Sequence, residues 1–181
     1  MIHKIIDNAI PEYVAGCLLD MMLESDRWLI RRRSGSEFNF KDYLTNPTTK
    51  IEKPQPSIFV LSDTGKITDH QLYGYCKSIF DYICYENGIV VKDLLRIIAN
   101  ANYETFDTLA YHTDNENDNY QSIVLMLTPN MTQTGFIVGD LLIPYEFCKA
   151  VWFDSKDLHT ATPLVEDHAL PRITIAFMFE V

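Results

Sequence analysis

The first apolar pattern along the chain has the period of a helix. Five side chains spaced at i, i+3, i+4, i+7 and i+8 form one stripe: Val14, Cys17, Leu18, Met21 and Met22. Pro11 suits a first helical turn, because its fixed φ matches the helix and its missing N–H leaves no hydrogen bond unmade. We therefore expect a helix that starts at Pro11 and fades around Arg27 to Arg31.

A second helical pattern lies further along. Its apolar face is formed by five residues: Leu72, Cys76, Ile79, Phe80 and Ile83. Thr68, with Gln71 three residues later, is a capping-box signature and predicts the start of this helix. Gly88 is well placed to be the left-handed residue that ends many helices.

The segment between the two helical patterns has the composition of a loop. Residues 34–57 hold three prolines and many turn-forming residues. A loop of this length is more often functional than idle, so this one is either a lid over a binding site or a surface connection. Ser57 to Leu61 then forms a short strand pattern.

From residue 93 onward the pattern is that of strands. Six segments rich in Ile, Val, Leu, Phe and Tyr are separated by turn residues: DLLRIIANANY, TLAYHTD, QSIVLMLTP, GFIVGDLLIPY, KAVWFD and RITIAFMFEV. Helices followed by such strands predict an α+β chain with a β-sandwich or barrel in its C-terminal half. The length of 181 residues fits one domain, 1–181. Within this domain we expect the supporting helices and the loop or lid in residues 1–92. The main part of the β core is expected in residues 93–181.

Composition narrows the class of protein. Hydrophobic residues make up 47% of the chain and charged residues 22%, as in ordinary globular domains, and no apolar run approaches the roughly 20 residues that cross a bilayer. Asp7 and Glu12 fall where a signal peptide would have its apolar stretch. The four cysteines are scattered without a C-x-x-C pair, which favours reduced thiols over a disulfide scaffold. We expect a cytoplasmic protein without a membrane segment.

The charge of the chain bears on its partners. The net charge is −10, whereas nucleic-acid binding draws most of its affinity from neutralising phosphates. A nucleic-acid partner is therefore not expected, and a small-molecule or peptide substrate is. One basic cluster, Arg31 to Arg33, is either a solvated loop or a patch that meets an anionic partner. The sequence leaves the oligomeric state unknown.

The candidate chemistry begins at His112 and Asp114, in the stretch LAYHTDNENDNYQ. If this stretch ends a strand, residues two apart point to the same face, although an aspartate after a strand often only caps a turn. His159 follows another predicted strand, and two imidazoles with one carboxylate form the facial site used for Fe(II). Arg172 begins the last apolar strand, where a guanidinium must reach solvent or a partner such as a carboxylate.

Together these residues resemble a known family. The H-x-D pair, the distal histidine and the R-x-T of the last strand resemble the Fe(II)- and 2-oxoglutarate-dependent oxygenases, in particular the prolyl-4-hydroxylase-like branch, over residues from about Leu94 to Val181. The resemblance implies a double-stranded β-helix (jelly-roll) core with supporting N-terminal helices. It also implies that His112, Asp114 and His159 bind Fe(II), with 2-oxoglutarate and O2 as co-substrates.

The resemblance extends to the co-substrate site. It implies that Arg172 grips the distal carboxylate of 2-oxoglutarate, with Thr174 beside it on the same strand face. Tyr103 takes the place of a tyrosine that hydrogen-bonds the co-substrate, and Tyr111 competes for this role. The Gly-Gly-acidic turn of many relatives is matched only in part, by QTGFIVGD around Gly135.

These assignments predict a dioxygenase that hydroxylates a peptidyl or free amino-acid side chain and releases succinate and CO2. The same chemistry on another small metabolite or on a methylated nucleobase is an alternative. A non-catalytic jelly-roll protein that only binds a metal is another, but such a module needs no carboxylate clamp like Arg172. His168 is the rival of His159, and we prefer His159 because His168 lies in a loop-like segment close to Arg172.

Overall fold

The computed structural model of the chain describes residues 1–25, 29–31, 37–39, 57–102, 111–164 and 170–181. The described elements follow in this order: β1 (Ile2–Ile6), α1 (Glu12–Glu24), β2 (Leu29–Arg31), β3 (Glu37–Asn39), β4 (Ser57–Asp63), β5 (Lys66–Ile67), α3 (His70–Asn87), β6 (Asp93–Asn102), β7 (Tyr120–Met126), β8 (Gly135–Val138), β9 (Leu141–Pro144), β10 (Ala150–Asp154), β11 (His159–Ala161) and β12 (Arg172–Glu180).

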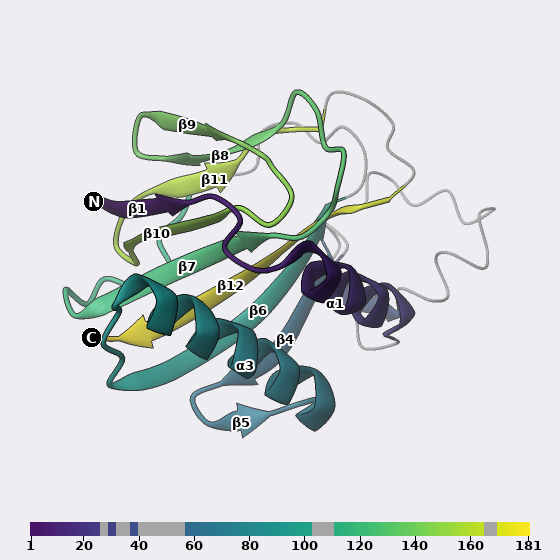
Figure 1. Ribbon diagram of the computed structural model, residues 1–181, viewed down its shortest axis with the longest axis horizontal. Helices are drawn as coiled ribbons and strands as arrows, with labels where there is room; N and C mark the ends of the chain where they lie inside the picture. Colours follow the sequence, from purple (N-terminus) through teal and green to yellow (C-terminus); the bar gives the residue numbers. More distant parts are fainter. Residues whose placement is uncertain (26–28, 32–36, 40–56, 103–110, 165–169) are drawn as a thin grey trace.

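The strands form two antiparallel sheets (Figure 1). The large sheet has the order β1-β10-β7-β12-β6-β4-β2-β3, with β5 paired to β4, and the small sheet has the order β11-β8-β9. His112 adds an isolated bridge to β11. Strands that are distant in sequence thus become neighbours. The predicted α+β class and jelly-roll architecture are confirmed.

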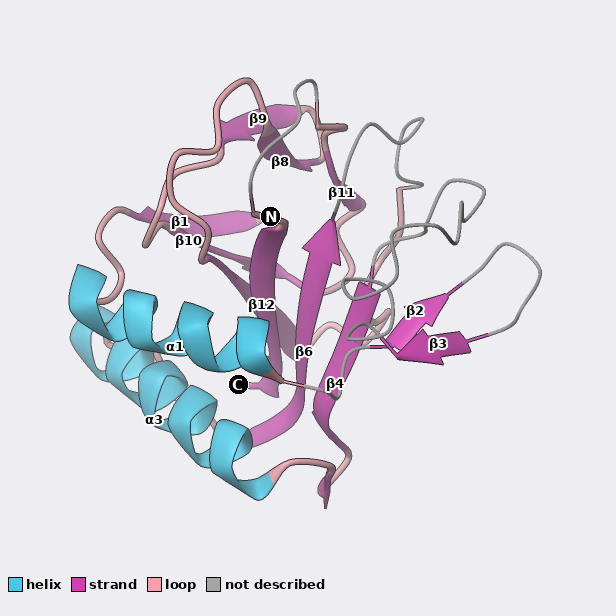
Figure 2. Ribbon diagram, turned by 90° about the vertical axis from the view of Figure 1, so that its right-hand side faces the viewer, coloured by secondary structure: helices cyan, strands magenta, loops and turns pink. Residues whose placement is uncertain are grey.

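The helices cover one face of the large sheet (Figure 2). Strand β12 shows how this face is made, because its residues alternate between the two sides. Ile173, Ile175 and Phe177 are fully buried in the core that α1 and α3 share with the sheet. Phe80 of α3 stacks on Phe177 with ring centroids 5.3 Å apart. The alternate residues of β12, Thr174 and Ala176, point to the other face of the large sheet, where the small sheet lies.

A second core fills the space between the sheets. Its buried members come from β7, β8, β10 and the segments around them: Val124, Met126, Met131, Phe136, Val138, Ile143, Tyr145, Val151, Phe153 and Leu164. Gly135 opens β8 at a very close approach to β9, where an added Cβ would lie 2.6 Å from the carbonyl oxygen of Ile143. Only glycine fits there without moving the backbone.

The helix boundaries differ from the predicted ones. Helix α1 ends at Glu24, because Ser25 adopts an extended conformation, and Leu29–Arg31 forms β2 instead of a fading helix. Pro11 occupies the N-cap position just before the first turn.

The predicted capping residue of α3 was wrong. Asp69, not Thr68, caps the helix, and its side chain accepts a hydrogen bond from Leu72 N at 2.9 Å. The hydroxyl of Thr68 instead donates to the carbonyl oxygen of Leu61 at 3.2 Å. Gly88 has φ of 64° and ends the helix as predicted.

Several short strands were missed, among them β1, β2, β3, β5 and β11, and one prediction stays open. β1 is an edge strand with mostly exposed residues, so its pattern carries little signal, and Glu37–Asn39 forms β3 inside the predicted loop. Most of the proposed lid, residues 40–56, lies outside the described residues. No helix within the described part of the chain is long and apolar enough to cross a membrane.

Candidate metal centre

Three side chains from two distant parts of the chain meet at one point. His112, Asp114 and His159 each offer a ligand atom, and these atoms all lie within 4.8 Å of one another. The rings of His112 and His159 have centroids 4.3 Å apart, and Oδ1 of Asp114 lies 3.6 Å from Nε2 of His159. Two imidazoles and one carboxylate so arranged can hold a divalent transition-metal ion and leave coordination positions open.

Backbone pairing brings the two histidines together. His112 N–H donates to the carbonyl oxygen of His159 at 3.1 Å, and His159 N–H donates back to that of His112 at 2.9 Å. Residues paired in this way place their side chains on the same side of the ladder. Nδ1 of His159 lies 2.8 Å from the carbonyl oxygen of Asp157. Because a carbonyl can only accept, this bond keeps the proton on Nδ1 and leaves the lone pair of Nε2 for a metal.

Loop contacts, rather than a strand, orient Asp114. Its N–H donates to the carbonyl oxygen of Ser155 at 2.9 Å, and the Ser122 hydroxyl donates to its Oδ2 at 2.6 Å. Ser122 and Ser155 are fully buried, with their hydroxyl oxygens 2.8 Å apart. The other carboxylate oxygen of Asp114, Oδ1, faces Nε2 of His159. The prediction that alternation along one strand aligns His112 with Asp114 was therefore wrong in mechanism, although the two side chains do meet.

The pair of Asp114 and His159 has the electrostatics of a cation site. Burial by itself would raise the pKa of Asp114, but hydrogen bonds and the positive charge of His159, with the Ser122 bond, hold that pKa below its ordinary value. Burial would lower the pKa of His159, but Asp114 raises it above its ordinary value. The carboxylate thus stays ionised, and a metal ion competes with a proton for Nε2 of His159.

A cavity of about 270 Å³ adjoins these three residues. Its floor is formed by alternate side chains of three neighbouring strands of the large sheet: Asn100, Asn102, Val124, Arg172, Thr174 and Ala176. Phe136 and His159 close it from the small sheet. The cavity therefore lies between the two sheets, with the three candidate ligands at its wall.

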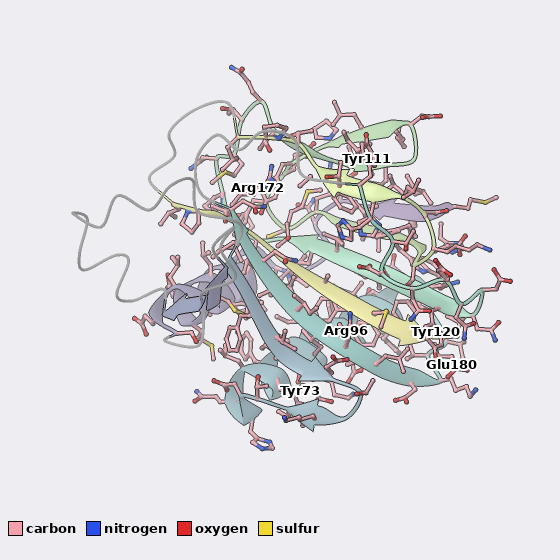
Figure 3. The ribbon with its side chains drawn as sticks, turned by 180° about the vertical axis from the view of Figure 1, so that it is seen from behind. Tyr73, Arg96, Tyr111, Tyr120, Arg172 and Glu180 are labelled. Atoms are coloured by element: carbon pink, nitrogen blue, oxygen red, sulfur yellow. The ribbon has the colours of Figure 1, made fainter. Side chains whose placement is uncertain are left out.

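Arg172 is the unusual member of the cavity lining, being only 1% exposed. Its Nη1 donates to the hydroxyl of Thr134 and, at 2.7 Å, to the carbonyl oxygen of Thr162. Its Nε is buried without a hydrogen-bond partner in the described part of the chain. Figure 3 shows Arg172 near one end of the sheet, away from Arg96 and Glu180.

The charge of Arg172 is not balanced by an acidic neighbour that the structure describes. Burial lowers its pKa to about 10, and the largest opposing influence is the hydroxyl of Tyr145. The guanidinium is therefore still charged at neutral pH, at a cost in desolvation. A buried cation with an unused N–H, facing a cavity, fits a ligand that carries a carboxylate.

The remaining predicted site residues are Thr174, Tyr103, Tyr111 and His168, and the structure describes only two of them, Thr174 and Tyr111. Thr174 lines the cavity on the same strand as Arg172, and its contact with a co-substrate stays a prediction. Tyr103 and His168 lie outside the described residues, so their assignments stay predictions. Tyr111 is 53% exposed and is absent from the lining of the cavity.

Several residues of the site were not identified from the sequence. Ser122 lies in β7 and Ser155 directly follows β10, so no local pattern in the sequence links either serine to Asp114. Asn100 and Asn102 did leave a signal, because they are polar residues two apart in the apolar strand β6. On the register of the sheet they lie opposite Thr174 and Arg172.

Sequence comparisons give no relatives. No protein-family model matches the chain, and no curated protein matches it.

Solved structures do match the fold. One is HygX from Streptomyces hygroscopicus with nickel and 2-oxoglutarate bound, with a TM-score of 0.64 and 8% identity over 97% of this chain and 81% of that one. Another is a prolyl hydroxylase from Trichoplax adhaerens in complex with a hypoxia inducible factor peptide fragment, with a TM-score of 0.60 and 13% identity over 98% and 83%. A prolyl-4-hydroxylase from Pseudomonas putida has a TM-score of 0.56 and 12% identity over 98% and 92%. The predicted likeness to this branch is confirmed at the level of the fold.

Proposed function

We propose that this chain is an Fe(II)- and 2-oxoglutarate-dependent oxygenase. One observation carries the proposal: a buried, uncompensated arginine faces the same cavity as a cluster of two histidines and an aspartate. A metal-binding module without turnover has no use for this arginine. A co-substrate that joins a metal to a distal carboxylate uses both features at once.

The proposed iron site consists of His112, Asp114 and His159. These residue types suit Fe(II) and leave positions for two further ligands. When bound, the iron supplies the oxidising chemistry that couples decarboxylation of 2-oxoglutarate to oxygenation of a substrate, with succinate and CO2 as products. In the chain itself, the carbonyl oxygen of Asp157 fixes the tautomer of His159. The hydroxyl of Ser122 fixes the orientation of the Asp114 carboxylate.

The proposed co-substrate site runs along β12. Arg172, Thr174 and Ala176 point into the cavity, and a rise of about 3.3 Å per residue puts about 13 Å between the first and the last. Val124, which pairs with Ala176, lies two residues from Ser122, the partner of Asp114. The arginine and the three candidate iron ligands therefore lie apart along one cavity, as a co-substrate that contacts both requires.

Likeness in fold supports two classes of substrate. Hydroxylation of a peptidyl or free amino-acid side chain is supported by the likeness in fold to prolyl hydroxylases, one of them in complex with a peptide. Oxidation of another small metabolite is supported by the likeness to SnoN, an alpha ketoglutarate dependent epimerase from nogalamycin biosynthesis, with a TM-score of 0.62 and 8% identity. The charge of −10 disfavours a methylated nucleobase within nucleic acid.

A cytoplasmic location is part of the same proposal. The four cysteines are free, and burial raises the pKa of Cys76 and of Cys84 to about 12. Such thiols are inert and suit a reducing compartment.

The test of the proposed function is release of succinate. The purified chain with Fe(II), ascorbate and air should convert 2-oxoglutarate to succinate, slowly alone and faster with a true substrate. Proline-containing peptides, free amino acids and methylated nucleotides form the screen. Asp114→Asn is the matched control, because it removes one charge and one ligand while keeping the shape of the side chain. A folded, iron-loaded chain that forms no more succinate than Asp114→Asn would refute the proposed function.

A further inference from the structure

Two buried polar atoms without hydrogen-bond partners belong to paired residues that both line the cavity. Among the described residues, the buried side-chain nitrogens and oxygens that lack a hydrogen bond are Arg172 Nε and Asn102 Oδ1. The two residues are direct partners in the pairing of β12 with β6, and both line the cavity. An unmet buried polar group is costly, and such groups are rare in folded proteins. Two such atoms on paired residues of one cavity indicate a ligand that contacts both residues.

The chemistry of the two side chains indicates which class of ligand they can bind. Arg172 offers an N–H donor and a positive charge. Asn102 is only 6% exposed, and its amide has one donor end and one acceptor end that a half-turn about its last torsion exchanges. A carboxylate accepts up to about four hydrogen bonds, so it can take the N–H of Arg172 and an N–H of Asn102 at once. Directly opposed residues have Cβ atoms about 5 Å apart, close enough for both to reach the same group.

We propose that Asn102 is a positioning residue that shares the distal carboxylate of the co-substrate with Arg172. This inference rests on the proposed function and assigns one more residue to its site. Arg172 supplies the charge, and Asn102 fixes the plane of the carboxylate from the neighbouring strand. The 2-oxo end of the molecule is thereby directed along Thr174 toward the three candidate metal ligands.

The test is the replacement Asn102→Asp, which keeps the shape but turns a donor into a second carboxylate. In the metal-loaded protein, the new carboxylate repels that of 2-oxoglutarate and pairs with Arg172. The dissociation constant for 2-oxoglutarate, measured by calorimetry with Mn(II) in place of iron, should rise about 100-fold or more. Affinity for 2-oxopentanoate, the same chain with a methyl group in place of the distal carboxylate, should stay within about twofold. The melting temperature without ligand should hold or rise, because Arg172 gains a partner.

One control and one alternative variant complete the test. Asn8→Asp adds the same charge at an exposed turn outside the lining of the cavity and should leave both affinities unchanged. If Asn102→Asp does not fold, Asn102→Leu, of similar volume and without a donor, should weaken 2-oxoglutarate alone by about tenfold or more.

The possible outcomes separate this inference from the proposed function. Equal binding of 2-oxoglutarate to the unaltered chain and to Asn102→Asp overturns the role of Asn102 and leaves the proposed function standing. An equal loss for 2-oxoglutarate and 2-oxopentanoate also overturns that role, because it marks a general disturbance of the site. If the unaltered, metal-loaded chain binds no 2-oxoglutarate, the proposed function fails and the inference fails with it.

Discussion

Replacement of His159 by alanine is expected to abolish iron retention. His159 is 3% exposed, its Nδ1 is held by the carbonyl oxygen of Asp157, and its Nε2 faces Asp114. Loss of an outer-shell partner alone commonly costs about 10–100-fold in metal affinity, so loss of a ligand should cost more than about 100-fold. Metal content after gel filtration, measured by elemental analysis, gives the direct readout.

The matched control for this result is His168→Ala. His168 is the other histidine close to the C-terminal strand in the sequence, and its removal should leave iron retention unchanged. Because His159 packs on Phe153, with ring centroids 4.9 Å apart, circular dichroism must show that the His159→Ala chain is folded. Iron lost from His168→Ala and kept by His159→Ala would transfer the ligand role to His168.

Replacement of Arg172 by methionine should separate binding from stability. The guanidinium is buried, lacks a described acidic partner and has a pKa lowered to about 10, so folding without a ligand bears the cost of its desolvation. A methionine of similar length removes that cost, and replacing buried charges with apolar residues is often neutral or stabilising. The melting temperature of the ligand-free variant should therefore hold or rise. Its affinity for 2-oxoglutarate should fall by about 100-fold or more, because the charge-assisted pair is lost.

Arg96→Met is the matched control for Arg172→Met. Arg96 lies on β6 of the same sheet and pairs with Asp63 at 3.2 Å, with its side chain 35% exposed. Its removal takes away the same charge but no cavity-lining group, so the affinity for 2-oxoglutarate should not change. If Arg172→Met binds 2-oxoglutarate as tightly as Arg96→Met does, Arg172 does not hold the co-substrate.

The sequence predicted those parts of the site that have a local signature. The H-x-D pair, the distal histidine and Arg172 at the head of an apolar strand each stand out in the amino-acid pattern, and the structure brings all four to one cavity. The strand β12 was readable because its apolar run is long and its alternation is regular.

The remaining parts depend on pairings that the sequence does not reveal. Thr134 and Thr162 reach Arg172 across 38 and 10 residues, and Ser155 reaches Asp114 through a backbone carbonyl that any residue could offer. Thr68 was predicted to cap α3, but Asp69 does so. The hydroxyl of Thr68 instead bonds the backbone of β4, which is a tertiary contact. Edge strand β1 was missed because its exposure leaves no strong apolar alternation.

We propose that one cavity holds a ferrous ion at three side chains and a 2-oxo diacid between that ion and Arg172. The most direct measurement is an anaerobic titration of the Fe(II)-loaded chain with 2-oxoglutarate, followed by visible absorption. We predict the weak charge-transfer band of a 2-oxo acid chelated to Fe(II), saturating with one equivalent bound. A folded chain that retains iron and shows no such band would rule out the proposed co-substrate site.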